Sequence, residues 1–203
     1  MPVGEIGGNV ARRPLKTDKM EHRIENKTMN QEKAIFAGGC FWCVECSLAK
    51  AGGVINGVSG YTGGHVANPS YDEVSSGQTG HVEAVEITYD PSKVTYNTLL
   101  EAFWKEIDPT DPGGQFADRG TQYKTAIFYM NAKQKKAAEA SRDRLSKSGR
   151  FKNPIVTQIL PAAPFYPAED HHQQYAMKNA THYKLYRYGS GRGPFLQKVW
   201  GGK

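Results

Sequence analysis

The stretch KAIFAGGCFWCVECSLAKAGG, residues 33–53, joins an apolar run to a segment with helical spacing. The apolar run predicts a short buried strand that ends in glycines. In residues 41–51, the side chains of Phe41, Val44 and Leu48 can share one helical face, and two glycines follow. The stretch therefore predicts a strand that leads directly into a helix, with a cysteine at the junction.

Strands and helices alternate through most of the remaining chain. The expected strands cover 54–64, 81–90, 123–130 and 154–160, and the expected helices cover 95–107, 131–148 and 168–180. The tail 186–203 is rich in glycine and aromatic residues, so we expect it to be loop-like. This order predicts an α+β fold, a two-layer α/β sandwich of the ferredoxin-like (α–β plait) type, in which helices flank a mixed sheet of about four to six strands.

The length and composition fit a single globular domain, with 203 residues of which 38% are hydrophobic. We expect residues 34–203 to form that domain. Residues 1–33 have almost no large apolar side chains and no clear periodicity, and are expected to be a flexible N-terminal extension. No apolar run approaches the roughly 20 residues that span a membrane, and no signal-peptide core is visible. The expected location is therefore the cytoplasm, where disulfides are usually transient and catalytic.

The three cysteines of the chain, Cys40, Cys43 and Cys46, follow one another at intervals of three residues. At the first turn of a helix, Cys40 would meet unpaired amides and the positive end of the helix dipole, which favour a thiolate and lower its pKa. Cys43 lies one turn on, at a Cα distance of about 5 Å that a disulfide tolerates. Cys46 is too far from Cys40 for a direct bridge, but it is one turn from Cys43. The spacing therefore permits a relay of disulfides along the helix.

Other uses of these cysteines stay open. A zinc site would need His171 or His172 as a fourth ligand, and three ligands on one helix converge poorly on a tetrahedron. Small buried cysteines can also be purely structural, an alternative that weighs most for Cys46. A strand–CxxC–helix unit by itself would suggest a general thiol–disulfide oxidoreductase. The spacing favours redox or nucleophilic chemistry over a metal site or a structural role.

Four longer motifs point to a narrower function. They are GGCFWCVE, SGYTGGHVANPSYDEVSSGQTGHVEAVEITYDP, FADRGTQYKTAIFY and PFYPAEDHHQQY. In this order and at this spacing they resemble the A-type peptide methionine sulfoxide reductases, over nearly the whole chain except the N-terminal extension. The resemblance implies a repair enzyme that reduces the S epimer of methionine sulfoxide, in oxidised proteins and as the free amino acid.

The resemblance assigns the catalytic roles residue by residue. Cys40 is the implied nucleophile, which attacks the sulfoxide sulfur and becomes a sulfenic acid. Glu83 is the implied acid that protonates the departing oxygen. On a strand, the side chains of Val85 and Ile87 lie on the same face as that of Glu83. This apolar setting would raise the pKa of the Glu83 carboxyl. Tyr71 and Tyr123 match the two tyrosines whose hydroxyls hydrogen-bond the sulfoxide oxygen.

Further matches concern substrate binding and support. Phe41 and Trp42 resemble the family's apolar wall for the substrate methyl group, although both rings could simply belong to the core. Asp118 matches an aspartate that orients loop amides or the substrate backbone, with a turn cap as the alternative. His172 matches a histidine with no obvious chemical step of its own, so we expect it to support neighbouring side chains. The resemblance implies no cofactor and no metal.

Recycling must differ from that of many relatives, which carry a resolving cysteine in a Cys-Gly-Arg stretch near the C-terminus. Here Ser190 stands in that place. Regeneration is therefore expected to use Cys43 or Cys46 as the resolving thiol, with thioredoxin as the implied reductant. No other macromolecular partner is expected. The net charge of +6 comes from scattered basic residues without a recognisable reading element for nucleic acid, and the chain is expected to be a monomer.

Overall fold

The computed structural model describes residues 30–201 together with Met1 and Gly4. Six strands in this part of the chain form one mixed sheet. They are β1 (Glu32–Gly38), β2 (Val54–Thr62), β3 (Val82–Tyr89), β6 (Thr125–Tyr129), β7 (Gln158–Pro161) and β8 (Phe165–Pro167). Their order across the sheet is β7-β6-β1-β3-β2-β8. The short strands β4 (Gly114–Gln115) and β5 (Asp118–Arg119) pair separately as a two-stranded ribbon.

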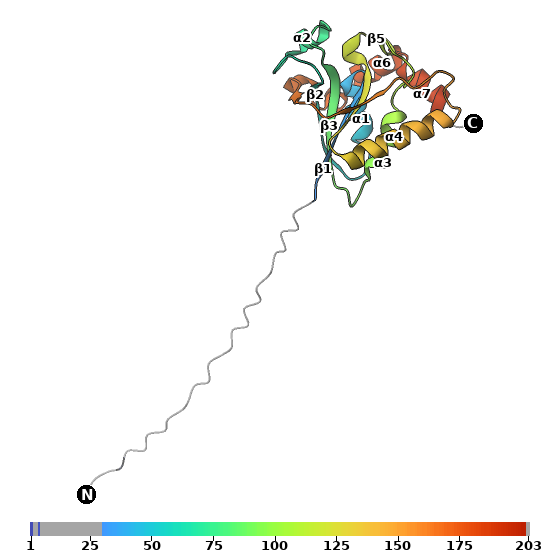
Figure 1. Ribbon diagram of the computed structural model, residues 1–203. Coiled ribbons are helices and arrows are strands. Elements are labelled where there is room, and N and C mark those ends of the chain that lie inside the picture. Colours follow the sequence, from blue (N-terminus) through green and yellow to red (C-terminus); the bar gives the residue numbers. More distant parts are fainter. Residues whose placement is uncertain (2–3, 5–29, 202–203) are drawn as a thin grey trace.

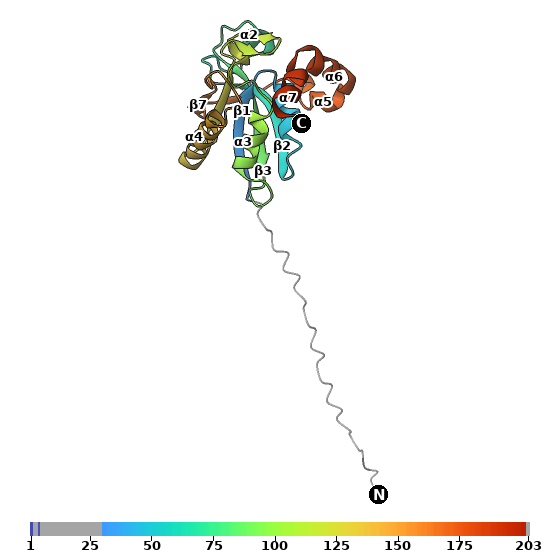
Figure 2. The ribbon, with the colours of Figure 1, turned by 90° about the vertical axis from the view of Figure 1, so that its right-hand side faces the viewer.

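Seven α-helices surround this sheet in the described residues. They are α1 (Phe41–Leu48), α2 (Tyr71–Ser75), α3 (Tyr96–Trp104), α4 (Ala132–Lys147), α5 (Tyr175–Lys178), α6 (Ala180–Gly189) and α7 (Arg192–Trp200), with 3-10 turns at Thr121–Tyr123 and Asp170–His172. Figure 1 shows how they lie around the strands. In Figure 2 the three C-terminal helices gather at one edge of the molecule, and α4 lies at the opposite edge. None of the helices in residues 30–201 is both long and apolar enough to cross a bilayer.

The strand pairing brings the start of α1 next to the middle of the sheet. All neighbouring strands are antiparallel except β6 and β7, which are parallel. Strand β3 lies between β1 and β2, so that α1 connects two strands that are not adjacent. Phe36 of β1 is opposite Val85 on β3 and Ile127 on β6. The C-terminal end of β1, where α1 begins, therefore lies beside the first half of β3.

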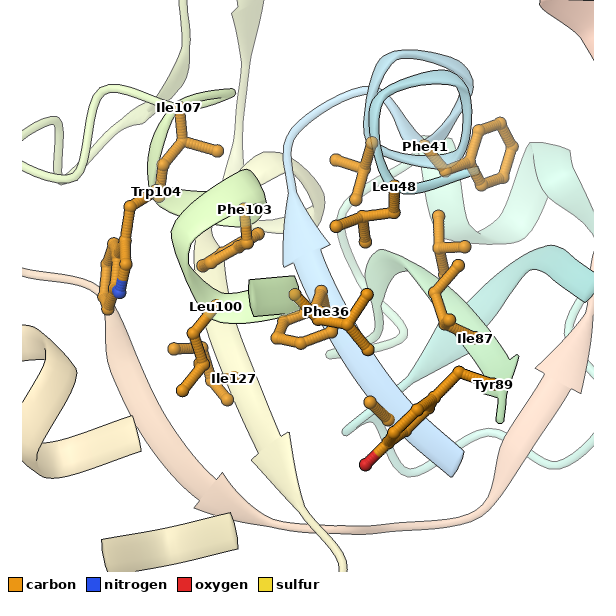
Figure 3. Packing of buried hydrophobic residues seen from close by; sticks show 14 of the residues in the cluster. Phe36, Phe41, Leu48, Ile87, Tyr89, Leu100, Phe103, Trp104, Ile107 and Ile127 are labelled. Atoms are coloured by element: carbon orange, nitrogen blue, oxygen red, sulfur yellow. The ribbon is translucent and has the colours of Figure 1, made fainter. Parts of the chain in front are cut away.

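The main hydrophobic core lies between the sheet and the helices α1 and α3. Figure 3 shows Phe36 of β1 close to Phe103 and Leu100 of α3, with Leu48 of α1 nearby. The rings of Phe36 and Phe103 stack at a centroid distance of 5.1 Å. Full burial of each such side chain contributes about 1.5–3 kcal/mol, so this face of the sheet holds α1 firmly in place. A smaller cluster, which includes Ile35 and Phe128, occupies the other face.

The junction between β1 and α1 accepts only glycine at residue 39. Gly39 has a φ of +74°, in the left-handed region that other residues avoid. A Cβ atom on Gly39 would lie 2.5 Å from Cβ of Gln115. Gln115 cannot easily move away, because its amide is fully buried and bonds the backbone of Asp108 at both ends. This turn lets the chain reverse from strand to helix within two residues.

The structure confirms the strands and helices predicted for the first two thirds of the chain, adds the unpredicted α2, β4 and β5, and corrects the C-terminal part. The tail 186–203 is not loop-like, because α6 runs to Gly189 and α7 follows at once. Gly191, with a φ of +87°, supplies the turn between these two helices. Gly189 and Gly191, which suggested a loop, therefore lie where one helix ends and the next begins.

Three other boundaries differ from expectation. The strand expected over 154–160 begins only at Gln158, and the three-residue strand β8 was not expected. The helix expected over 168–180 is a 3-10 turn followed by the one-turn helix α5. The expected extension 1–33 lies mostly outside the described residues, although residues 32 and 33 already belong to β1.

The strained junction gives a direct test of the fold. We expect Gly39→Ala to lower the free energy of unfolding by about 2–4 kcal/mol, because alanine there must adopt a left-handed conformation and overlap Gln115. Gly52→Ala is the matched control, since no atom lies within 4 Å of the Cβ it would add. Urea denaturation of both variants measures the difference. Equal stability of the two variants would contradict the account of the junction.

Candidate active site

The β1–α1 junction opens into a cavity of about 190 Å³. Its lining consists of Cys40, Phe41, Trp42, Tyr71, Glu83, Asp118, Tyr123 and Tyr186. These residues come from five separate parts of the chain, and all except Tyr186 were predicted from the sequence. The predicted residues Cys43, Cys46 and His172 lie next to this cavity's walls rather than in its lining.

Glu83 is a buried acid held at the start of helix α1. Its side chain comes from β3, and the residue is only 3% exposed. The backbone N–H of Phe41, the first residue of α1, donates to Oε2 of Glu83 at 3.0 Å. Burial raises the pKa of Glu83 to about 8, opposed by this hydrogen bond and assisted by the negative charge of Asp118. The carboxyl group is therefore largely protonated at neutral pH, as its apolar strand neighbours predicted.

Cys40 is the residue that caps α1, and it is almost completely buried. Burial raises the pKa of its thiol well above the ordinary value, and the hydrogen bond to Cys43 and the charge of Glu83 add to this effect. The expectation of a lowered pKa at Cys40 was therefore wrong. The helix N-terminus does favour a thiolate, but loss of hydration disfavours it more strongly. Cys40 and Glu83 consequently both hold their protons at neutral pH.

Tyr71 and Tyr123 present their hydroxyl groups to the same cavity. Tyr71 begins α2, whose first turn is fixed by a capping box between Ser70 and Glu73. Its backbone N–H donates to Glu169 Oε1 at 2.8 Å. Burial and the nearby Glu83 raise the pKa of both tyrosines, which therefore stay protonated and act as hydrogen-bond donors.

Tyr186 is a pocket residue that the sequence did not reveal. Its hydroxyl donates to Oδ2 of Asp118, which orients both side chains in the lining. Burial raises the pKa of Tyr186, and a hydrogen bond links its hydroxyl to the thiol of Cys40. Asp118 thus acts on the pocket partly through Tyr186. Because Tyr186 belongs to the tail that was expected to be loop-like, its periodicity on α6 gave no usable signal.

Trp42 belongs to the cavity lining, and two neighbouring side chains hold it in place. Its indole stacks on Tyr175 at a centroid distance of 3.8 Å, and its Nε1–H donates to Nδ1 of His172 at 3.3 Å. Burial lowers the pKa of His172, so the ring is neutral and can accept this hydrogen bond. His172 also packs against Phe41 and Tyr71. The structure therefore brings His172 into a position that supports three lining residues, with no direct access to the cavity's interior.

Cys43 lies behind Cys40, in the most charged part of the interior. Cys43 has no exposed surface, and its pKa is lowered to about 7. The hydrogen bond from Cys40 is the main cause, and the positive charges of Arg192 and Arg187 assist against the effect of burial. Cys43 is therefore the cysteine that ionises near neutral pH.

The two arginines are held by one buried carboxylate. Glu106 accepts a bidentate pair of hydrogen bonds from Arg187, and its backbone oxygen accepts from Nη1 of Arg192 at 2.7 Å. Arg192 is fully buried, and its Nη2 donates to the backbone oxygen of Gly38 at 3.0 Å. Arg192 thus links helix α7 to the β1–α1 junction. The sequence did not predict roles for Glu106, Arg187 or Arg192, because nothing in a sequence shows that a charged side chain is buried.

No group of three or more His, Cys, Asp or Glu side chains in the described part of the chain is arranged to hold a metal ion. The three cysteines are free. His172, one of the two candidate zinc ligands, instead accepts its hydrogen bond from Trp42. The arrangement suits an acid, a nucleophilic sulfur and hydroxyl donors acting around one small cavity.

The sequence matches a known family over almost all of its described length. The family described as "Peptide methionine sulfoxide reductase" matches residues 32–203. The peptide methionine sulfoxide reductase MsrA of Bacillus subtilis is 58% identical over 173 residues, which cover 85% of this chain and 98% of the relative. The corresponding protein of Bacillus licheniformis is 57% identical, with 85% and 96% covered.

Two solved structures have folds similar to that of this chain. Methionine sulfoxide reductase A of Corynebacterium diphtheriae superposes with a TM-score of 0.66 at 34% identity and covers 74% of this chain and 76% of its own. Mxr1 of Saccharomyces cerevisiae in its reduced form superposes with a TM-score of 0.70 at 29% identity, with 74% and 86% covered. The sequence matches and the structural matches therefore agree on the group of proteins that this chain resembles.

The charged surroundings of Cys43 predict a thiol that ionises early. In the Cys46→Ser variant, ultraviolet thiolate absorbance should show one ionisation near pH 7, because the hydrogen bond from Cys40 and the two arginines stabilise the Cys43 thiolate. Replacing Cys43 by serine in that background should abolish this ionisation. Persistence of the signal without Cys43, or a first ionisation above the ordinary thiol pKa of about 8.5, would contradict the assignment.

Proposed function

Because the chain belongs to the peptide methionine sulfoxide reductase family, we propose that its cavity performs the reduction with Cys40 as nucleophile and Glu83 as acid. The protein is an oxidoreductase that acts on the sulfur of methionine sulfoxide. The observation that carries the assignment of roles is the protonated carboxyl of Glu83, held by the Phe41 amide in the same cavity as the Cys40 thiol. An acid and a sulfur nucleophile are the two groups that this reaction needs.

The first step transfers the sulfoxide oxygen from the substrate to Cys40. The sulfur of Cys40 attacks the sulfoxide sulfur while the carboxyl of Glu83 gives its proton to the sulfoxide oxygen. The attack forms a transient S–S bond between Cys40 and the substrate; the hydroxyl group then moves to the Cys40 sulfur as the substrate's S–O bond and this S–S bond break. Methionine leaves as the thioether, and Cys40 carries the oxygen as a sulfenic acid. The thiol proton of Cys40 replaces the proton that Glu83 gave up. Cys40 is oxidised by two electrons, and the substrate is reduced by two.

The hydroxyl groups of the cavity stabilise the developing charge on oxygen. Tyr71 and Tyr123 are protonated donors on the side of Glu83, and they bind an oxygen that becomes more negative as the S–O bond polarises. Phe41 and Trp42 supply the apolar wall that a methyl group requires, since only burial and dispersion can bind it. The volume of about 190 Å³ is small for a ligand site, which suits the end of one side chain.

The presence of both polar and apolar groups in the lining also accounts for the expected choice of epimer. When the oxygen meets Glu83, the methyl group meets Trp42 and the rest of the substrate leaves through the cavity's opening, only one configuration at sulfur fits. The mirror-image sulfoxide would have to exchange its oxygen and methyl positions, which leaves buried donors unpaired. The S epimer is the proposed substrate, as the resemblance to the A-type reductases implies, since one enzyme serves each configuration.

Cys43 is the proposed resolving thiol. Its thiolate attacks the sulfur of the Cys40 sulfenic acid, an S–S bond forms, and hydroxide leaves and is protonated to water. Three features support this role: the low pKa of Cys43, its hydrogen bond with Cys40, and the one-turn spacing on α1. Thioredoxin is the proposed reductant of the resulting disulfide. Ser190 caps α6 where many relatives have a cysteine, so it offers no alternative sulfur.

Two further assignments accompany this function. The units β1–α1–β2 and β3–α3–β6, with the strand order β6-β1-β3-β2, support a ferredoxin-like plait at the centre of the fold. Three free cysteines that must be returned to the thiol state after each turnover support a reducing compartment, the cytoplasm.

A single-turnover assay with resolved epimers tests the proposal. Reduced protein should convert one equivalent of the S epimer of a blocked methionine sulfoxide to the thioether, and none of the R epimer. Cys40→Ser should form no product. Glu83→Gln should slow product formation by about 10²–10⁴-fold, because the oxygen then lacks its proton donor. The wild-type rate should fall as pH rises through about 8, where Glu83 loses its proton.

Glu86→Gln provides the matched control on the same strand. Glu86 lies on the opposite side of β3 and pairs with Lys33 at 2.7 Å, so its neutralisation should leave the rate unchanged. Reduction of insulin disulfides in preference to the sulfoxide would instead indicate a general thiol–disulfide oxidoreductase. Equal rates for Glu83→Gln and Glu86→Gln would reject Glu83 as the acid.

A further inference from the structure

Glu45 is a buried carboxylate that the proposed mechanism does not use. It lies on α1, three residues after Trp42, and is only 5% exposed. Burial of a charged group is unfavourable unless hydrogen bonds compensate for the lost hydration. Burial raises the pKa of Glu45, and hydrogen bonds from Gln174 and Ser59 oppose this effect. An apolar side chain would fill the position more favourably, so we expect the carboxylate to have a function of its own.

Glu45 binds the segment between the 3-10 turn Asp170–His172 and helix α5. The backbone N–H of Gln174 donates to both carboxylate oxygens, at 3.2 Å each. Oε2 also accepts from Oγ of Ser59, on β2, at 3.1 Å. The side chain of Gln173 bonds the backbone N–H and the backbone oxygen of Ser59, at 2.9 Å each. One polar cluster therefore joins α1, β2 and this segment.

Gln174 has a backbone conformation that its hydrogen bonds to Glu45 help to hold. Its φ of +54° lies in the left-handed region, which residues other than glycine avoid. This turn brings His172, before it, and Tyr175, after it, against the same indole ring, that of Trp42. The hydrogen bonds from Gln174 to Glu45 offset the strain of the turn. Both supports of the Trp42 indole therefore depend on these bonds.

We propose that Glu45 is a positioning residue for the substrate methyl group, which acts through the segment 172–175 on the indole of Trp42. This inference rests on the proposed function, in which Phe41 and Trp42 form the apolar wall of the substrate cavity. Trp42 and Glu45 are three residues apart on α1, so one side of this helix supplies both the wall and the anchor of its supports. Glu45 does not line the substrate cavity but a separate cavity of about 340 Å³. It therefore acts on the substrate only through neighbouring side chains.

A wall that is held in place selects its ligand by size. A substrate with an ethyl group in place of the methyl group brings one extra methylene, which a well-packed wall resists. When the segment 172–175 loosens, the indole of Trp42 can shift and admit the larger group. Glu83 is held separately, by the amide of Phe41, and stays in place. Glu45 should therefore affect the choice between methyl and ethyl sulfoxides more than the chemical step itself.

Competition between two sulfoxides tests this role. The S epimers of methionine sulfoxide and of its ethyl homologue are mixed in equal amounts, and the ratio of the two thioether products gives the ratio of their kcat/KM values. Because the Gln174 N–H bonds both oxygens of Glu45, the NH2 group that Glu45→Gln introduces faces this N–H in either orientation. We expect the preference for the methyl substrate to fall about fivefold or more in Glu45→Gln. An unchanged preference would overturn the inference.

Ser59→Ala gives a milder version of the same test. It removes one hydrogen bond to Glu45 and leaves the carboxylate in place, so the preference for the methyl substrate should fall by a smaller factor. If Glu45→Gln does not fold, Ser59→Ala decides the question, and an unchanged preference there would overturn the inference. A wild-type protein that reduces neither sulfoxide would instead reject the proposed function.

Ser141→Ala is the matched control. Nε1–H of Trp104 donates to Oγ of Ser141 at 2.8 Å, so this variant also loses a buried hydrogen bond and also leaves an indole N–H without its acceptor. Neither residue lines the substrate cavity, and the preference for the methyl substrate should stay at the wild-type value. An equal fall in Ser141→Ala and Glu45→Gln would indicate a general effect of lost stability and would overturn the inference.

The NMR signals of the indole N–H groups report on the wall without any substrate. The Trp42 signal, assigned by its absence in Trp42→Phe, should shift in Glu45→Gln, because the hydrogen bond to Nδ1 of His172 weakens. The Trp104 signal should stay in place in this variant and should shift instead in Ser141→Ala. A Trp42 signal that is unchanged in Glu45→Gln would overturn the inference.

Discussion

The hydrogen bond from the Phe41 amide to Glu83 is the contact on which the active site depends. It joins the middle of the sheet to the first turn of α1, and so fixes an acid beside the cysteine that caps this helix. Burial in this position keeps the Glu83 carboxyl protonated, whereas at the surface it would be ionised at neutral pH. The glycine turn before Cys40 and the buried Arg192 hold the same junction from the other side. Fold stability and chemistry are therefore tied to the same few residues.

Burial of the cysteines has two consequences that oppose one another. A sulfenic acid on Cys40 is protected, because water and oxidants have little access to it and Cys43 is already beside it. The same burial leaves little of either sulfur exposed to a protein reductant. A third cysteine, Cys46, lies one turn further along α1, is partly exposed and lines a separate cavity.

The sequence predicted the parts of this arrangement that depend on local patterns. The strand before Cys40, the helix after it and the alternation around Glu83 all follow from short-range periodicity. The lining residues from distant segments, such as Tyr71 and Asp118, came only from resemblance to a family. Tyr186 and Arg192 were missed, because glycines concealed the C-terminal helices and because nothing in a sequence shows that an arginine is buried. The lowered pKa expected at Cys40 was wrong, since a helix-start argument omits the cost of burial.

The protonation state of Glu83 before substrate binds is the central claim, and carbon NMR tests it directly. The protein would be labelled at the side-chain carboxyl carbons of glutamate, and Glu83→Gln would assign the signal of Glu83. The account predicts that this signal titrates near pH 8 in the reduced, substrate-free protein. Titration near the ordinary glutamate pKa of about 4.3 would show an ionised carboxylate at neutral pH, and would contradict the mechanism.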